Sequence, residues 1–389
     1  KLDFSSAVKR SRQVSDRLTR GVGFLLKKHN VQVIMGSATV KAKDEVLIKG
    51  NDGQEQRLKV KNIIIATGSK AASLPGVPID GEKVLSYREA ILQEKLPKSV
   101  VIIGAGAIGL EFATIWRSYG SEVTLVEMLP RIAPLEDEDV SKEVQKAFTK
   151  RGIVCLPGTK VQKIEPARDG VKVTMTSDEG EQILEAEQAL MAIGFKPNSL
   201  DLGLEEIGVA LTERKHINVD NRMATNIQGI WAIGDVTGKS LLAHTAMAQG
   251  ILCAEVIAGK QVQPIDYVMI PRATYCHPQV ASFGYTEAQA REKGLAVRIG
   301  KFPLQANGKA LGLGELVGFV KIIVDEEYGE ILGAHMIGAE VTELLPELTL
   351  AQNNELTIEE VMHNIHAHPT LSEAVMEAAE NSVGMSIHI

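Results

Sequence analysis

One short segment of the 389-residue sequence constrains the fold more than any other, because an apolar strand there leads directly into a glycine-rich turn and a helix. The expected strand covers residues 100–103, and Gly104, Gly106 and Gly109 follow in the spacing Gly-x-Gly-x-x-Gly. The first glycine permits a tight turn, the second lets the backbone approach a pyrophosphate, and the third lets the helix pack on the strand. Free N–H groups at the helix N-terminus favour phosphate. The segment therefore predicts a dinucleotide-binding βαβ unit.

An acidic residue further along refines this prediction. Glu127 follows the second expected strand, residues 123–126, at the distance of about 20 residues that is typical of dinucleotide-binding units. A carboxylate in this place accepts hydrogen bonds from both ribose hydroxyls and repels a 2′-phosphate. We therefore expect NAD rather than NADP as the ligand.

Composition excludes several classes of protein. The 42 Lys and Arg residues are outnumbered by 49 Asp and Glu, and the net charge of −7 argues against a nucleic-acid binder. No uncharged apolar run approaches the roughly 20 residues that span a bilayer, so no membrane segment is expected. Cys155, Cys253 and Cys276 match neither a zinc site nor a two-cysteine redox motif. This cysteine usage suits a reducing compartment, with the cytoplasm as the default location.

The spacing of apolar residues along the rest of the chain predicts an α/β protein. Apolar residues at three- and four-residue steps indicate an amphipathic helix over residues 4–28. Further helices are expected at residues 107–119, 138–150 and 242–259, and from residues 341, 358 and 370 onward. Further strands are expected at residues 31–35, 45–48, 56–60, 63–65, 153–156, 161–164, 171–175, 188–193, 229–233, 319–324 and 331–336.

Two apolar strands end in small polar residues, the first at Gly68 and the second at Asp235. Ligands of open α/β sheets bind at such strand ends, but similar dipeptides are also common in ordinary turns. If these ends form a site, Asp235 accepts a hydrogen bond from a polyol hydroxyl of a flavin-type cofactor. The residues from Leu241 to His244 would then open a helix whose first amides face that flavin.

Three histidines fall within residues 363–368, close to the C-terminus. Pro369 disfavours the helical conformation at His368, so this imidazole is expected on an extended segment before a helix that begins at Thr370. Thr370 and Glu373 fit the capping-box pattern, which would explain the acid without any chemistry. Alternatively, His368 is a general acid/base whose second ring nitrogen is hydrogen-bonded to Glu373. The residue types favour neither reading. A metal site is disfavoured, because no cysteine or acidic ligand accompanies the histidines at ligand spacing.

Four segments carry a resemblance to a known family. They are His-Ala-His-Pro-Thr-Leu-Ser-Glu at residues 366–373, Gly-Ala-Gly-Ala-Ile-Gly-Leu-Glu at 104–111, Ala-Ile-Gly-Asp at 232–235 and Pro-Gln-Val-Ala-Ser-Phe-Gly-Tyr-Thr-Glu at 278–287. In this order they resemble the pyridine-nucleotide disulfide oxidoreductases, and within them the dihydrolipoamide dehydrogenases, over essentially the whole chain.

The resemblance implies two Rossmann-like nucleotide-binding domains, the first of them incomplete, and a C-terminal α+β dimerisation domain. The implied boundaries are residues 1–96 for the FAD domain, 97–223 for the NAD domain, 224–266 for a return to the FAD domain and 267–389 for the dimerisation domain.

The resemblance also implies the site residues and the cofactors, FAD and NAD. The flavin contacts would be Ala38, Thr67, Gly68, Ser69, Asp235, Leu241, Leu242, Ala243 and His244. The NAD contacts would be Gly104, Ala105, Gly106, Ala107, Ile108, Gly109, Leu110, Glu111, Glu127, Val161 and Gly194. His368, oriented by Glu373, would take a proton from dihydrolipoamide in the active site of the other subunit, and no metal is implied.

The sequence departs from the family pattern in its first domain. Family members begin with a further Gly-x-Gly-x-x-Gly that holds the FAD pyrophosphate, followed by a Cys-x4-Cys disulfide, and this sequence carries neither. We therefore expect that the N-terminal segment is missing and that the chain as written does not turn over lipoamide. The three cysteines are better explained as packing thiols. A smaller departure is Phe195-Lys196 after Gly194, where many relatives carry Arg.

The resemblance to this family also implies a homodimer. Its partners would be the lipoyl domains and the acyltransferase core of 2-oxo acid dehydrogenase complexes, with the glycine-cleavage carrier protein as a further candidate. Two other functions stay open. A soluble pyridine nucleotide transhydrogenase shares the fold and needs no disulfide, but Glu127 argues against it and against glutathione reductase, since both use NADPH. The chain could also be a catalytically silent, NAD-binding dimer scaffold.

Overall fold

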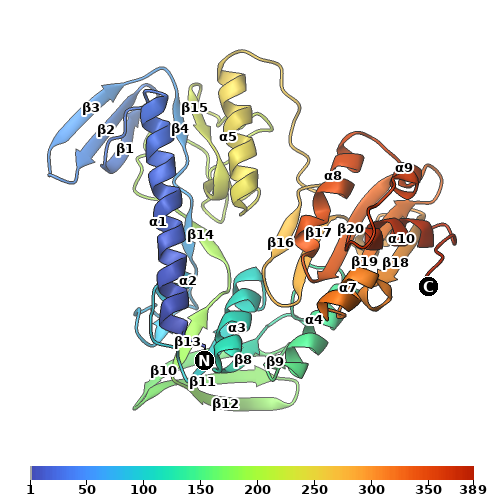
Figure 1. Cartoon of the computed structure of the whole chain (residues 1–389). Helices are drawn as coiled ribbons and strands as arrows, with labels where there is room; N and C mark the ends of the chain where they lie inside the picture. Colours follow the sequence, from blue (N-terminus) through green and yellow to red (C-terminus); the bar gives the residue numbers. More distant parts are fainter. Residues whose placement is uncertain (1) are drawn as a thin grey trace. The chain divides into compact units, whose positions relative to one another are not determined.

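The computed structural model of the chain describes residues 2–389, which form two compact units (Figure 1). The larger unit combines residues 73–193 with residues 268–389 and the first few residues, and the smaller unit combines residues 6–72 with residues 194–267. Each unit is therefore built from stretches that are far apart in the sequence. None of the described helices is long and apolar enough to cross a membrane.

A five-stranded parallel sheet forms the centre of residues 73–193, which we call the parallel-sheet domain. The strand order is β6 (Val84–Leu85), β13 (Gln188–Met191), β7 (Ser99–Ile103), β8 (Glu122–Val126) and β9 (Val154–Leu156). Helices α2 (Tyr87–Ala90), α3 (Ala107–Tyr119) and α4 (Glu138–Lys150) follow β6, β7 and β8 along the chain. A three-stranded antiparallel sheet is added by β10 (Lys160–Ala167), β11 (Gly170–Ser177) and β12 (Gly180–Ala186). This is the expected α/β arrangement.

Helix α3 shows how the local sequence determines which face of a helix is buried and where the helix ends. Leu110, Ala113 and Trp116 recur at three-residue steps and are buried in the core. Gly120 adopts the left-handed conformation, with φ +108°, and ends the helix. The expected bounds of this helix are confirmed, and so are those of α4 and of α1 (Phe4–Lys28).

Residues 268–389, the antiparallel-sheet domain, contain a second five-stranded sheet. Its order is β16 (Arg272–Thr274), β17 (Gln279–Gly284), β20 (Ile331–Gly338), β19 (Phe319–Asp325) and β18 (Val297–Pro303). Its helical elements are α6 (Glu287–Glu292), η2 (Leu304–Ala306), α7 (Gly308–Leu313), η3 (Val341–Glu343), α8 (Leu345–Asn353), α9 (Ile358–His363) and α10 (Glu373–Asn381). Helix α10 packs on β18 and β19, whereas α4 of the parallel-sheet domain packs on both β9 and β20. The two domains therefore share one core within the larger unit.

The smaller unit holds α1 and three short sheets. An antiparallel meander is formed by β1 (Gly36–Ala42), β2 (Glu45–Gly50) and β3 (Glu55–Lys59). A parallel pair is formed by β4 (Ile63–Ile65) and β15 (Ile230–Ala232), and an antiparallel pair by β5 (Ser69–Ala71) and β14 (Phe195–Pro197). The chain after β15 forms the single turn η1 (Gly234–Thr237) and helix α5 (Ala243–Ile257).

Two expected elements are wrong. Residues 31–35 form no strand, because β2 ends at Gly50, which pairs with Gly36, and the chain before Gly36 therefore has no strand to pair with. The last helix begins at Glu373 rather than at Thr370. The sequence pattern also missed β12, whose mainly exposed, polar residues give no apolar alternation.

Candidate functional site

The glycine turn after β7 is shaped by close backbone contacts. Gly104 has φ +101°, and a Cβ built on it would lie 2.4 Å from the carbonyl oxygen of Ala192. A Cβ on Gly109 would lie 2.0 Å from the carbonyl oxygen of Gly104, so the helix and the turn touch there. At Gly106, in contrast, no heavy atom lies within 4 Å of such a Cβ. The protein itself therefore requires glycine at two of the positions and leaves the space beside the third one open.

The first turn of α3 is available to a phosphate. Gly106 is the N-cap residue, and no side chain accepts a hydrogen bond from the following amides. The N-terminus of a helix carries unsatisfied N–H groups and a partial positive charge. Ala107 and Ile108 lie in this turn, which continues to Leu110 and Glu111. The geometry fits the pyrophosphate of a dinucleotide.

Glu127 lies directly after β8, at the same edge of the sheet. Its carboxylate is buried, with Oε2 accepting the Ala105 N–H at 2.8 Å and Oε1 accepting the Leu129 N–H at 2.9 Å. Each carboxylate oxygen has two lone pairs, so capacity is left for ribose hydroxyls. The structure therefore brings the predicted acid to the predicted glycine turn.

Three further predicted NAD contacts lie in different surroundings. Glu111 accepts the Tyr275 N–H at 2.9 Å, and burial raises the pKa of its carboxyl, which this hydrogen bond offsets only in part. Val161 is buried in the core between the parallel sheet and the β10–β12 sheet. Gly194 belongs to the smaller unit, where its carbonyl oxygen accepts the Ala72 N–H at 2.9 Å.

The two strand ends of the smaller unit do meet. Because β4 and β15 are parallel neighbours, the residues that follow them emerge at one edge. Ser69 donates a hydrogen bond from Oγ to Asp235 Oδ2 at 2.7 Å. Thr67 donates from Oγ1 to the carbonyl oxygen of Asn198 at 2.7 Å, and Gly68 between them has φ +68° with open space beside it. These contacts tie the two ends into one polar edge that a polyol hydroxyl can reach.

Helix α5 presents a second group of donors in this unit. Leu242 is its N-cap residue and makes no side-chain capping hydrogen bond, and Ala243 and His244 are the first residues of the helix. Gln249, fully buried in α5, accepts the Gly234 N–H at 2.6 Å and donates to the Tyr267 hydroxyl at 3.0 Å. The partial positive charge at the N-terminus of this helix and the polar edge fit the flavin and polyol parts of FAD.

Sequence reasoning missed Gln249, although a glutamine in the middle of a helix of mainly small and apolar residues was an available signal. Leu241 precedes α5 and is exposed. Ala38 lies in the meander, where it pairs with Ile48 across β1 and β2.

His368 and Glu373 form a hydrogen-bonded pair in the larger unit. The His368 Nδ1 and Glu373 Oε1 atoms are 2.9 Å apart, and the imidazole is 78% exposed. An ionised carboxylate only accepts hydrogen bonds, so the neutral imidazole carries its proton on Nδ1 and leaves Nε2 as a free base. This is the arrangement of an oriented general base.

The Glu373 carboxylate also accepts a hydrogen bond from the backbone. Oε2 of Glu373 accepts the Thr370 N–H at 2.8 Å, whereas the Thr370 hydroxyl donates to the carbonyl oxygen of Ala367 at 2.7 Å. The capping box is therefore only half formed, and the two readings of Glu373 are compatible. Burial raises the pKa of Glu373, but the hydrogen bonds from Thr370 and His368 outweigh it and bring this pKa below its ordinary value.

The other histidine of the motif has a structural environment. His366 is almost completely buried, with Nδ1 2.8 Å from the carbonyl oxygen of Asn364 and Nε2 2.8 Å from Glu347 Oε1. Within residues 2–389, no group of three His, Cys, Asp or Glu side chains is arranged to hold a metal ion.

The three cysteines are all unpaired. Burial raises the pKa of the Cys155 and Cys253 thiols to about 11 and that of Cys276 to about 12. Thiols with such pKa values carry almost no thiolate near neutral pH, and the thiolate is the nucleophile. These cysteines are therefore packing residues rather than redox centres.

Comparison with known proteins agrees with this geometry. Residues 2–250 match the family described as pyridine nucleotide-disulphide oxidoreductase, and residues 270–379 match the dimerisation domain of that family. The dihydrolipoyl dehydrogenase of Mycobacterium tuberculosis is 49% identical over 387 residues, which are 99% of this chain and 83% of the relative. That of Corynebacterium glutamicum is 47% identical over 394 residues, with the same coverage.

Solved structures show the same fold. The crystal structure of LpdA from Mycobacterium tuberculosis has a TM-score of 0.91 at 27% identity, covering 98% of this chain and 83% of that one. The HOCl-induced flavoprotein disulfide reductase RclA from Escherichia coli has a TM-score of 0.89 at 25% identity, covering 98% of this chain and 86% of that one.

These matches confirm the predicted fold class, the enzyme class of NAD-dependent oxidoreductase and the use of FAD and NAD(H). The dimerisation domain supports a homodimer. The chain therefore belongs to the pyridine nucleotide-disulphide oxidoreductase family.

Proposed function

We propose that this chain acts in the oxidation of protein-bound dihydrolipoamide to lipoamide by NAD+, with FAD and a redox disulfide, which the cysteines of this chain do not form, as the carriers between them. The observation that carries the proposal is the His368–Glu373 pair, which presents a free imidazole Nε2 beside a carboxylate that fixes the tautomer. The relatives named dihydrolipoyl dehydrogenase, at 41% to 49% identity, support the choice of substrate.

In this proposal His368 accepts a proton from the dithiol, and the resulting thiolate attacks a redox disulfide that Cys155, Cys253 and Cys276 do not form. Lipoamide forms as that disulfide is reduced to a dithiol. Glu373 is a positioning residue that holds the imidazole and stabilises the imidazolium formed by proton transfer. Bound FAD would supply the two-electron carrier between the reduced disulfide and NAD+. No sulfur-exchange step is assigned to Cys155, Cys253 or Cys276, since burial keeps these thiols protonated.

The cofactor contacts follow the same proposal. Residues 104–111, Glu127, Val161 and Gly194 would contact NAD, with Glu127 accepting from the adenosine ribose. Ala38, residues 67–69, Asp235 and residues 241–244 would contact FAD. The support is the open glycine turn, the uncapped helix α3 and the polar edge joined by Ser69 and Asp235.

The assembly is proposed on the same basis. His368 would act in the active site of the other subunit, and the domains would divide at residues 96, 223 and 266. The partners would be the lipoyl domains and the acyltransferase core of 2-oxo acid dehydrogenase complexes, and the glycine-cleavage carrier protein, in the cytoplasm. The relatives do not favour a transhydrogenase or a silent scaffold.

Replacing His368 in a holoenzyme that carries both FAD and a redox disulfide tests the function. Loss of a general base typically costs about 100- to 10,000-fold in rate, so His368→Gln should lower NAD+ reduction by dihydrolipoamide by at least about 100-fold. Electron transfer from NADH to a dye needs no thiol deprotonation and should be unchanged. His363→Gln, at the exposed end of α9, is the matched control and should alter neither rate. Equal loss of both activities in His368→Gln would refute the assigned role.

A further inference from the structure

The segment of residues 128–136 leads from Glu127 to α4 and contacts the glycine turn at Ala105. Both backbone groups of Ala105 are hydrogen-bonded. Its N–H donates to Glu127, directly before the segment, and its carbonyl oxygen accepts the N–H of Ala133, within the segment, at 3.0 Å. Ala133 has φ +47°, a left-handed conformation that is disfavoured for a residue with a Cβ. Its buried surroundings must therefore impose this conformation.

Asp137 fixes the far end of this segment. It is buried and is the N-cap residue of α4, with Oδ1 accepting the Asp139 N–H at 3.1 Å. The same side chain also crosses to the antiparallel-sheet domain, where Oδ2 accepts the Glu287 N–H at 3.2 Å and Oδ1 lies 2.9 Å from Lys321 Nζ. One carboxylate therefore starts the helix and joins the two domains of the larger unit.

Lys321 lies in β19 and is only 3% exposed. Its ammonium group lies 2.9 Å from Asp137, 2.8 Å from Glu287 and 3.1 Å from Asp139, so three carboxylates surround it. An ammonium group has three N–H donors, so each donor has a partner. Burial alone would lower the pKa of Lys321, but the carboxylates outweigh it and raise this pKa above its ordinary value.

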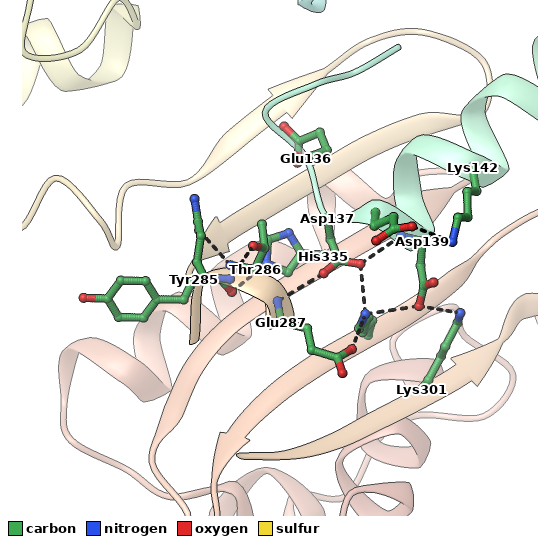
Figure 2. A network of polar contacts seen from close by, with 12 residues as sticks. Glu136, Asp137, Asp139, Lys142, Tyr285, Thr286, Glu287, Lys301 and His335 are labelled. Carbon is green, nitrogen blue, oxygen red and sulfur yellow. Dashed lines mark hydrogen bonds and ion pairs between the residues drawn. The ribbon is translucent and has the colours of Figure 1, made fainter. Parts of the chain in front are cut away.

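The surroundings keep this buried cluster near charge balance. Lys301 lies 2.9 Å from the same oxygen of Asp139, and Arg291 lies 2.9 Å from Glu287 (Figure 2 shows Lys301 beside Asp139). A buried charge without its partner costs several kcal/mol, so the cluster fixes the positions of its members more strictly than a surface ion pair does. Asp137, at the end of residues 128–136, is thus held by Lys321 of strand β19, whereas the start of the segment contacts the glycine turn.

We propose that Lys321 is a positioning residue for the adenosine half of NAD. It holds Asp137, Asp137 holds the segment of residues 128–136, and that segment holds Ala105 and Glu127 in the geometry that receives the ribose and the pyrophosphate. The inference rests on the proposed NAD site at Glu127. It assigns to the dimerisation domain a role in the affinity for the nucleotide, besides its role in the homodimer.

Titration of the full chain with NADH and with ADP-ribose tests the proposal. Lys321→Met should raise the dissociation constants of both by about tenfold, and Lys321→Arg, which keeps the charge, should restore much of the affinity. Lys142→Met is the matched control, because it removes an exposed ion pair with Glu138 on the same helix α4 and should change neither constant. Unchanged dissociation constants in folded Lys321→Met would overturn the proposal, even if its melting temperature fell.

A second variant decides the question if Lys321→Met does not fold. Asp137→Asn keeps an oxygen that can cap α4 but removes the charge and the acceptor for the Glu287 N–H. It should raise the dissociation constant for NADH by a few-fold, and an unchanged constant would overturn the proposal.

Glu127→Ala distinguishes failure of the proposed NAD site from failure of the positioning role. If it leaves NADH binding unchanged, the NAD site itself is wrong; if it weakens binding while the Lys321 and Asp137 variants do not, only the positioning role fails.

Discussion

The glycine turn allows stability and nucleotide binding to be separated by two alanine substitutions three residues apart. Gly109→Ala would place a Cβ 2.0 Å from the Gly104 carbonyl oxygen, so either the helix or the turn must move. Such overpacking costs about 1–3 kcal/mol, which lowers the melting temperature by several degrees. Gly106→Ala meets no atom within 4 Å and has φ −78°, which any residue adopts.

The expected stability of Gly106→Ala is close to that of the unsubstituted chain. Alanine is the poorer N-cap residue by roughly 0.5–1 kcal/mol, but replacing glycine also lowers the entropy of the unfolded chain, which stabilises by about 0.4–1 kcal/mol. Nucleotide binding should nevertheless suffer, because the new Cβ stands where the pyrophosphate approaches the backbone. Losing one hydrogen bond to a charged group costs about 1.5–3 kcal/mol, so the dissociation constant for NADH should rise roughly ten- to hundredfold.

The assay is a fluorescence titration with NADH beside a thermal melt of each variant. We expect Gly106→Ala to lose affinity at unchanged melting temperature and Gly109→Ala to lose melting temperature. If Gly106→Ala binds NADH as tightly as the unsubstituted chain, the pyrophosphate does not lie on this turn and the derivation of the NAD site fails.

Two further predictions concern charge. Glu127→Gln should raise the affinity for NADPH relative to NADH, because the carboxylate that repels a 2′-phosphate is gone; an unchanged NADPH:NADH ratio in paired titrations would contradict the assigned role of Glu127. The pKa values of Asp137 and Asp139 lie below their ordinary range, because the ammonium groups of Lys321 and Lys301 outweigh the effect of burial, and Lys321 likewise lowers the pKa of Glu287. These carboxylates stabilise the folded state fully above their pKa values in the unfolded chain, and this stabilisation is lost as the pH falls through their pKa values in the folded chain. The free energy of unfolding should therefore decrease below roughly pH 5. Urea titrations from about pH 3 to 7 would measure this decrease. Asp137→Asn should flatten this decrease, and an unchanged slope would contradict the argument.

Much of the parallel-sheet domain could be predicted from sequence because its signals are local. The helix over residues 107–119 follows from apolar spacing and from Gly120, and the acid at Glu127 follows from its distance to the glycine turn. The strand predicted at residues 31–35 is wrong because strand pairing depends on residues outside the segment. The apolar alternation of residues 31–35 fits a strand, but pairing depends on where β2 ends, and apolar spacing within the segment does not contain that information.

Two features of the candidate site depended on contacts that sequence patterns do not reveal. Glu373 matched both a capping pattern and a catalytic pattern, and only the structure shows that its two oxygens serve the backbone and His368 separately. Lys321 stands alone within an apolar strand, which is a signal for a buried charge. Its three carboxylates come from residues 137, 139 and 287, and only the folded structure brings them within ion-pair distance of β19.

The central claim is that a dithiol reduces NAD+ on this fold, and it can be tested in one measurement. A holoenzyme that carries both FAD and a redox disulfide is mixed anaerobically with dihydrolipoamide and either NAD+ or NADP+, and the reduced nucleotide is followed by its absorbance. We predict rapid formation of NADH with NAD+ and almost none of the reduced product with NADP+. Absence of NADH formation by a holoenzyme that still passes electrons from NADH to a dye would contradict the account.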